Sequence, residues 1–278
     1  MKEEVVSFQS AGLRLHGVLS VPDGLRPGDR RAAFLVLHGF GSNSSSPTCI
    51  TPAKVLNEFG YVTLRFDMRS CGKSEGEFGR IICLEQVEDT GNALNFLAQH
   101  GNVDPDRIGV IGSSFGGAVG VYAGGINPRI AAVVSNGGWG HGERKFRGQH
   151  RTPEAWAKFT KMLEEGKAHR ARTGRSLMVP RYDIVPIPDH VRANLDKQGV
   201  GMLAPNSVET FPAETAQSMF DFRAEEVVGN IAPRPLLKAP HRPRSGSARR
   251  RRSPAALPVE VHHRADAARY RRCRGRVR

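Results

Sequence analysis

The chain has 278 residues and a formal net charge of +14, from 41 Lys and Arg against 27 Asp and Glu. Residues 238–278 hold one Lys and thirteen Arg against two acidic residues, so +12 of this charge lies there and only +2 lies in residues 1–237. The high charge therefore belongs to a tail, which excludes net charge as an argument that the whole chain binds nucleic acid.

Hydropathy and cysteine content indicate a cytoplasmic protein without membrane association. No apolar run approaches the ~18 residues of a membrane span, and the first residues, "MKEEVVSFQS", lack the apolar core of a signal peptide. The four cysteines show neither metal-ligand pairing nor a small disulfide framework, so we expect reduced thiols. We expect no cofactor and no bound metal, and the sequence leaves the oligomeric state open.

The segment before residue 140 alternates strand and helix patterns. "VVSFQSAGLRLHGVLSVP" alternates apolar and polar residues, which predicts an antiparallel hairpin. The later patterns are a buried strand at "AAFLVLHGFGSN", a helix over 51–60 with Pro52 in its first turn, a buried strand at "YVTLRFD", a helix at "LEQVEDTGNALNFLAQHG", a strand, turn and helix at "DRIGVIGSSFGGAVGVYAGG", and a strand at "RIAAVVSNGG". This alternation predicts an α/β fold with a mostly parallel sheet covered on both faces.

The pattern changes after residue 139, and it divides the chain into four parts. Residues 1–139 form the N-terminal part of the core, and residues 140–222 read as a helical cap without strands. Residues 223–237 resume the strand pattern at "IAPRPLL", which stops at the end of "PRPLL". Residues 238–278 form an Arg-rich tail that we expect to be disordered.

A Gly-rich turn between a predicted strand and a predicted helix contains the candidate nucleophile. The turn reads Gly112-Ser113-Ser114-Phe115-Gly116. Such a strand-to-helix elbow exposes a serine hydroxyl near backbone donors, which nucleophilic catalysis on a carbonyl requires. The alternative is the Gly-rich turn of a Rossmann-like unit, but the context favours Ser114 as a nucleophile.

A second turn, "LHGFGSN", supplies candidates for an oxyanion hole. The backbone N–H of Phe40 is one expected donor and that of Phe115 is the other. Taken alone, this segment could be a simple tight turn after a strand. His38 precedes the turn, and we expect it to anchor the loop by hydrogen bonding rather than to act as a general base.

These motifs, with "FDMRSCGKSEG" and the cap before "PRPLL", resemble the α/β-hydrolase family over residues 1–237. The pattern is nearest to dienelactone hydrolases, acyl esterases and Xaa-Pro peptidase-like domains. The resemblance implies an α/β-hydrolase fold, with a helical cap and a Ser, Asp, His order along the chain. Ser70 stands where the family usually has glycine, and we expect local strain there.

The tail does not supply the expected Asp and His in that order. After "PRPLL" no Asp occurs until Asp266, and it follows His262 and His263, so the order is reversed. His263 remains a weak candidate for the general base, whereas Asp183, Asp189 and His190 are expected to be ordinary cap residues. We therefore expect the last strand and the end of the triad to be missing.

Three interpretations of the tail compete. It could be a nucleic-acid arm, although it has a single aromatic residue, Tyr270. It could be a solvating disordered tail. We favour a frameshifted or otherwise altered C-terminus, because the patterning is lost at one point and the Arg, Ala, Pro and Gly bias is typical of GC-rich codons read out of frame.

The expected function is therefore that of a serine hydrolase acting on a small acyl substrate, an ester, thioester or amide. Trp139, Trp156 and Phe220 are candidates to shape an acyl pocket, and packing of the cap is an equally good explanation for them. The alternative is a nucleic-acid-binding protein that uses the tail. Beyond non-specific contacts of the tail, we expect no nucleic-acid partner.

Overall fold

A computed structural model describes residues 1–26, 28–187, 193, 205–239 and 260–261. The backbone forms an eight-stranded sheet in the order β1-β2-β4-β3-β5-β6-β9-β10. The strands of this sheet are β1 (Lys2–Ser10), β2 (Leu13–Val21), β3 (Arg31–Leu37), β4 (Val62–Phe66), β5 (Val103–Ser113), β6 (Ile130–Asn136), β9 (Leu236–Ala239) and β10 (Glu260–Val261). The strands from β4 to β9 run parallel, while β1, β2 and β10 pair antiparallel with their neighbours. The predicted α/β fold with a mostly parallel sheet is confirmed.

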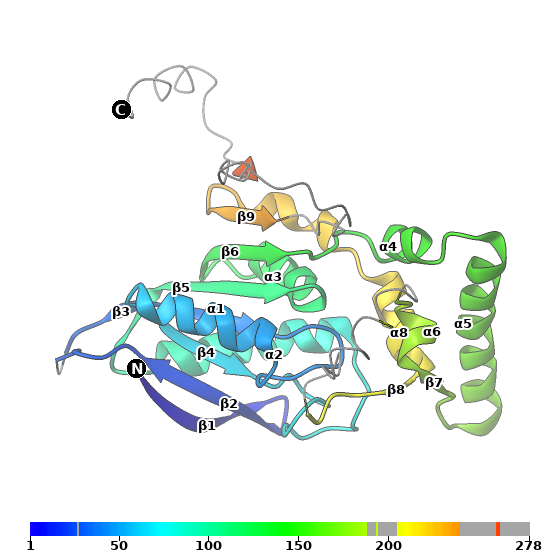
Figure 1. The fold of residues 1–278 in the computed structure, drawn as a ribbon, viewed down its shortest axis with the longest axis horizontal. Coiled ribbons are helices and arrows are strands. Elements are labelled where there is room, and N and C mark those ends of the chain that lie inside the picture. Colours follow the sequence, from blue (N-terminus) through cyan, green and yellow to red (C-terminus); the bar gives the residue numbers. More distant parts are fainter. Residues whose placement is uncertain (27, 188–192, 194–204, 240–259, 262–278) are drawn as a thin grey trace, which may run out of the picture.

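Helices cover both faces of this sheet (Figure 1). The helices of the core are α1 (Pro47–Glu58), α2 (Cys83–Ala98) and α3 (Phe115–Ile126), followed late in the chain by the 3₁₀ turns η1 (Ala224–Glu226) and η2 (Val228–Ile231). Along β3, Leu35 and Leu37 belong to the main core with α2 and α3, whereas Val36 packs in a separate cluster with Cys49 and Ala53 of α1. The continuous apolar pattern of β3 follows from this burial on two sides.

The start of α1 differs from the expectation. The helix begins at Pro47, earlier than the predicted range, so Pro52 lies inside it instead of in its first turn. Proline is favoured at the first position of a helix, where its missing N–H has no partner to lose. Pro47 follows Ser46 just as Pro52 follows Thr51, so the local sequence at the observed start resembles that at the expected start.

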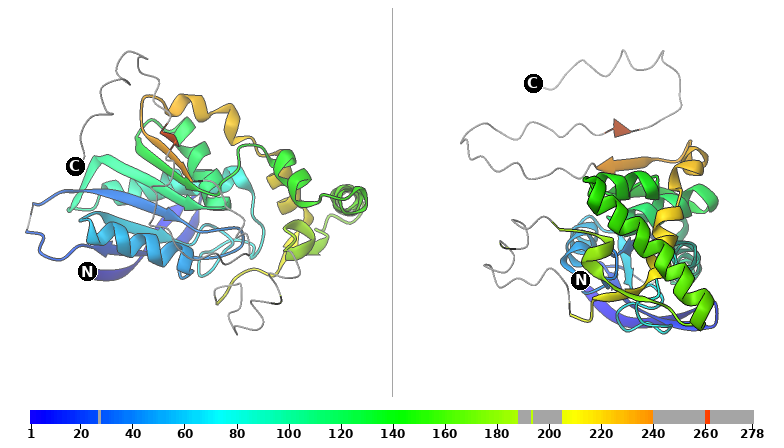
Figure 2. Two further views of the ribbon diagram at one scale, coloured as in Figure 1. Left: turned by 45° about the horizontal axis from the view of Figure 1, so that its top comes forward. Right: turned by 90° about the vertical axis from the view of Figure 1, so that its right-hand side faces the viewer.

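The cap lies at one end of the sheet, beyond the tips of β5 and β6 (Figure 1). Its described elements are α4 (Gly142–Gln149), α5 (Pro153–Thr173), α6 (Arg181–Ile184), α8 (Ala213–Asp221) and a two-stranded sheet of β7 (Met178–Pro180) and β8 (Thr210–Pro212). The expectation of a cap without strands is wrong at β7 and β8. Each of these strands has three residues, too few for an alternating pattern to appear in the sequence. Figure 2 shows α5 on the outer side of the cap, away from the sheet.

The sheet ends at β9 and β10. β9 pairs parallel to β6, and Glu260 and Val261 of β10 pair with Lys238 and Leu237 of β9. The final strand is thus reduced to a two-residue pairing in the described part of the chain. The remainder of the Arg-rich tail, with its expected disorder, lies outside the described residues.

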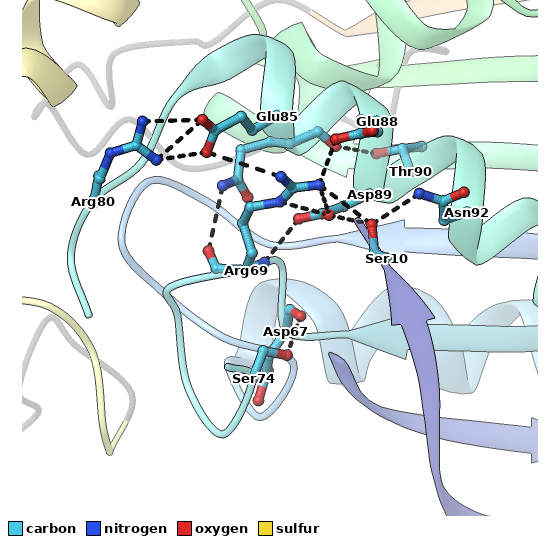
Figure 3. A network of polar contacts seen from close by, with 11 residues as sticks. Ser10, Asp67, Arg69, Ser74, Arg80, Glu85, Glu88, Asp89, Thr90 and Asn92 are labelled. Carbon is cyan, nitrogen blue, oxygen red and sulfur yellow. Dashed lines mark hydrogen bonds and ion pairs between the residues drawn. The ribbon is translucent and has the colours of Figure 1, made fainter. Parts of the chain in front are cut away.

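A buried ionic network ties β1, the loop after β4 and helix α2 together (Figure 3). The Arg69 guanidinium donates to Oδ1 of Asp89 at 2.6 and 2.8 Å, and Asp89 is fully buried. Ser10 donates to the same oxygen at 2.6 Å, and the Arg69 backbone N–H donates to Oδ2 at 2.8 Å. Each oxygen of the buried carboxylate is therefore satisfied, which is the condition for a buried charge to be tolerated.

Candidate active site

Ser114 lies between β5 and α3, and its side chain is exposed. Its backbone has φ 54° and ψ −113°, a conformation that residues with a Cβ rarely adopt. The Ser114 N–H donates to the Asn136 carbonyl at 2.8 Å, which fastens this turn to the end of β6. The hydrogen bond to the end of β6 holds this strained conformation at the end of β5.

The glycines on each side of Ser114 are required by close approach of the backbone. A Cβ on Gly112 would lie 2.1 Å from the Gly116 carbonyl oxygen. A Cβ on Gly116 would lie 2.5 Å from the His38 carbonyl oxygen. The elbow therefore packs directly against its own helix and against the end of β3, which brings Ser114 next to the loop that contains Phe40.

The two expected oxyanion donors flank this turn. Phe115 is the first residue of α3, where a helix leaves its N–H without a partner inside the helix. Phe40 follows β3, and its ring centroid lies 6.1 Å from that of Phe115. In the described part of the chain neither N–H donates to a backbone carbonyl outside the helices and strands. Among the described residues, neither group is thus committed to a hydrogen bond with a turn or loop carbonyl.

His38 anchors the loop that contains Phe40, as expected. Its Nδ1 lies 2.8 Å from the Gly39 carbonyl oxygen, and its Nε2 accepts from the Met68 N–H at 3.1 Å. This pair of contacts selects the neutral tautomer protonated on Nδ1. The ring is buried, and this burial lowers the pKa of His38 below its ordinary value. Both nitrogens are occupied within the fold, so His38 does not serve Ser114 as a base.

The loop after β4 is joined to the loop after β3 by the Asp67 carboxylate. Asp67 accepts from the Ser44 N–H at 2.6 Å and from the Lys73 N–H at 2.9 Å. This carboxylate therefore joins the loop after β3 to the loop after β4. Ser70, where glycine was expected, has φ 66° in the left-handed region. The expected strain is present at this residue.

Replacing Ser70 by glycine should stabilise the protein. A left-handed conformation costs a residue with a Cβ about 1–2 kcal/mol, and glycine avoids this cost. Part of the resulting stabilisation is offset because glycine has more conformational entropy in the unfolded chain. We expect the free energy of unfolding to rise by about 1 kcal/mol in Ser70→Gly, measured by urea denaturation. The matched variant Ser45→Gly changes an exposed serine that lacks a positive φ, and it should lose stability. Equal losses in both variants would show that Ser70 is not strained.

The structure brings no base to Ser114 within the residues it describes. Asp183 of the cap pairs with Lys158 at 2.8 Å, in keeping with an ordinary cap residue. The other candidates of the sequence, Asp189, His190, His262, His263 and Asp266, lie outside the described residues. The described ranges also contain no cluster of three or more His, Cys, Asp or Glu that could hold a metal ion.

Aromatic side chains connect the elbow to the cap. Trp139 follows β6, and its ring centroid lies 5.8 Å from that of Phe115. Trp156 and Phe220 lie 6.2 Å apart, and each contacts Phe159 in the middle of the cap. Trp139 is thus the aromatic candidate next to the elbow, whereas Trp156 and Phe220 pack with each other.

One cap residue at this site carries no recognisable sequence signal. Arg181, at the start of α6, donates to the carbonyl oxygens of Phe40 and Val208. The contact with Phe40 spans 141 positions in the chain, and no motif surrounds Arg181. A lone arginine in a cap is indistinguishable in sequence from the many exposed ones around it.

We expect the free energy of unfolding to decrease as the pH is lowered below about 6.5. Burial lowers the pKa of both His38 and His150 from the ordinary 6.5, so the folded chain holds them neutral where the unfolded chain takes up protons. This stability is complete above about pH 6.5 and is lost as the pH falls toward the lowered folded-state values. Each histidine adds up to about 1.4 kcal/mol per pH unit in that window.

Denaturant unfolding at several pH values from 5 to 8 would measure this slope. His150 stacks on Phe159 at 4.5 Å and contacts the Ile184 carbonyl through Nε2, so His150→Gln should remove its share of the slope. The same slope in His150→Gln and the unchanged chain would contradict this assignment.

Comparison with known proteins places these features in a family. Residues 34–266 match the model of the Alpha/beta hydrolase family. A polyketide transferase from Stachybotrys chlorohalonatus is 35% identical over 138 residues, 49% of this chain and 44% of that protein. A thiohydrolase from Aspergillus aculeatus is 32% identical over 135 residues, 48% of this chain and 40% of that protein.

A solved structure shares the fold over most of the chain. A hypothetical protein from Pseudomonas aeruginosa superimposes with a TM-score of 0.72 and 24% identity, covering 85% of this chain and 76% of that one. The chain spans about half the length of the first curated relatives that it matches. No described helix is long and apolar enough to cross a membrane.

Proposed function

This chain belongs to the alpha/beta hydrolase family, and we propose that it is a serine hydrolase whose site is built to form an acyl-enzyme on Ser114. The substrates would be carboxylic esters, thioesters or amides, and the protein would be cytoplasmic. In the reaction the Ser114 oxygen bonds to the substrate carbonyl carbon, a base takes the hydroxyl proton, and the carbonyl electrons collect on its oxygen. The bond to the leaving group then breaks and leaves the acyl-enzyme. Water attacks the acyl carbon in the second half of the reaction, which releases the carboxylic acid and restores the Ser114 hydroxyl.

The observation that carries this proposal is the backbone of Ser114. Its φ of 54° costs stability and has no packing purpose of its own, because the side chain is exposed. In the proposed site this strained turn presents the Ser114 hydroxyl to the substrate, beside the N–H groups of Phe40 and Phe115. The two donors would hold the oxyanion of the tetrahedral intermediate, where each is worth about a hundredfold or more in rate.

We favour a thioester among the three substrate classes. The similar protein from Aspergillus aculeatus is named a thiohydrolase. A thiolate is also a better leaving group than an alkoxide or an amine, so its departure requires least help from a general acid. This difference matters for a chain whose described residues bring no acid to the leaving group.

We further propose that the chain is impaired as it stands. The Asp and His of a triad would have to come from residues beyond β9, where the order is His262, His263, Asp266. Without a base the Ser114 hydroxyl keeps its proton at neutral pH, and acylation is slow. The nucleic-acid alternative rests on the same Arg-rich residues and on no feature of this site.

Trapping of the acyl-enzyme tests the proposed function. The chain would be incubated with matched acyl thioesters, p-nitrophenyl esters and anilides, quenched in acid and analysed by intact mass and peptide mapping. We expect an acyl group on Ser114, formed most readily from the thioester and absent from Ser114→Ala. Acylation of other residues alone, or equal acylation of Ser114→Ala, would refute the proposal.

A further inference from the structure

Arg181 reaches from the cap onto the loop that follows β3. Its Nη2 donates to the Phe40 carbonyl oxygen, and its Nη1 donates to the Val208 carbonyl oxygen at 2.9 Å. A longer contact of 3.5 Å joins Nη1 to the Gly41 carbonyl oxygen. One side chain therefore binds the loop that follows β3, at Phe40 and Gly41, and the cap segment before β8, at Val208.

The guanidinium of Arg181 is surrounded by aromatic rings and backbone carbonyls of this loop and of the cap. Its guanidinium carbon lies 5.3 Å from the ring centroid of Phe40 and 5.9 Å from that of Phe211, and the two rings stack at 4.3 Å. Both distances fall within the range of cation–π attraction. No ion pair joins Arg181 to a carboxylate in the described ranges, and burial lowers the pKa of its guanidinium. Its hydrogen bonds to the described part of the chain go to backbone carbonyls.

The peptide that carries the Phe40 N–H is fixed on its other side by the core. A trans peptide is planar, so its N–H and C=O point in opposite directions. The Gly39 carbonyl oxygen contacts His38 Nδ1 at 2.8 Å and accepts from the Ser42 N–H at 3.1 Å. These contacts orient the Phe40 N–H from one side, while Arg181 holds the next peptide through the Phe40 carbonyl.

The loop and the cap are also fitted closely to each other. Gly41 has φ 54°, and a Cβ there would lie 2.5 Å from Phe211 and 2.8 Å from Nη1 of Arg181. The Val208 N–H donates to the Gly41 carbonyl oxygen at 2.8 Å. Movement of the cap segment would therefore move the loop, because no space separates the two.

We propose, resting on the hydrolase function above, that Arg181 is a positioning residue that aligns the Phe40 N–H with the oxyanion when the cap is seated on the sheet. The oxyanion hole then has a core half, Phe115, and a cap-dependent half, Phe40. A substrate that displaces the cap therefore loses the stabilisation of its transition state by the Phe40 N–H. The site accordingly selects acyl groups that the closed cap accommodates.

Two measurements on the full chain test this role. The first is hydrogen–deuterium exchange of the peptide covering residues 38–44 in Arg181→Met, Arg181→Lys and the unchanged chain. Lysine offers a point charge in place of a bidentate fork. The matched control is Arg170→Met, since Arg170 is an exposed cap arginine paired with Glu214. We expect about tenfold faster exchange in Arg181→Met, a smaller change in Arg181→Lys and none in Arg170→Met.

The second measurement is acylation of Ser114 by an activated thioester over a range of concentrations. Misalignment of one oxyanion donor should lower the maximal acylation rate at least tenfold in Arg181→Met, while the half-saturating concentration stays unchanged. A merely structural residue would instead alter the folded fraction, which a parallel thermal melt detects.

The outcomes separate this proposal from the proposed function. Unchanged exchange in residues 38–44, or equal changes in Arg170→Met, would overturn the role of Arg181 whether or not the chain is active. Faster exchange with an unaltered maximal rate would overturn it as well. If the unchanged chain never acylates Ser114, the hydrolase function fails, and the exchange measurement alone decides whether Arg181 positions the loop.

Discussion

Turnover of an activated ester by this chain should be on the order of a millionfold below that of the same body with a complete triad. The reason is protonation of the nucleophile, since the structure brings no imidazole to Ser114 within its described residues. The oxyanion donors and binding should still leave about a thousandfold acceleration over water. Steady-state hydrolysis of p-nitrophenyl esters, compared with the buffer rate, measures both limits.

A matched chain tests the cause of this loss. If another reading frame after codon 237 encodes Asp and then His, the chain carrying that ending should recover rapid turnover. Rapid and saturable turnover by the present chain, abolished in Ser114→Ala, would contradict the prediction. That result would point to His262 or His263 as the base, despite the reversed order of histidine and aspartate in the tail.

Replacing Asp89 by asparagine should destabilise the fold by about 3–5 kcal/mol. The substitution keeps the shape of the side chain, but it leaves the Arg69 guanidinium, whose side chain is 8% exposed, without its buried counter-charge. Loss of a partner in a buried pair costs far more than the pair contributes, because the remaining charge cannot be rehydrated. Urea denaturation followed by circular dichroism measures the change.

Glu88 provides the control on the same guanidinium. It lies 2.7 Å from Nη2 of Arg69, but its side chain is 53% exposed. Surface ion pairs contribute at most about 1 kcal/mol, so Glu88→Gln should have a small effect. Similar losses in the two variants would mean that the network is not held by its buried carboxylate.

Local sequence patterns predicted the fold and the elbow because their causes are local. The elbow requires glycine at Gly112 and Gly116 within five residues, and the buried strands require continuous apolar runs. The strain at Ser70 was equally visible, since a motif position that normally holds glycine signals a positive φ. In each case the physical requirement acts on neighbouring residues.

The features that sequence reasoning missed depend on contacts between distant segments. Arg181 meets the Phe40 carbonyl only after the cap folds over the sheet. The strands β7 and β8 exist because residues 178–180 and 210–212 meet across a long cap, not because of an alternating pattern. The Arg69–Asp89 pair likewise depends on how α2 packs against the loop after β4. Neither composition nor periodicity of the sequence indicates contacts between such distant segments.

The central claim is that the fold prepares Ser114 as a nucleophile beside preformed oxyanion donors. Prolonged reaction with an alkyl fluorophosphonate, followed by peptide mapping, tests it in the native chain and in the urea-unfolded chain. The account predicts slow modification of Ser114 that is about a thousandfold faster in the native chain than in the unfolded one. Equal rates in the two states, or native modification spread over other serines, would contradict it.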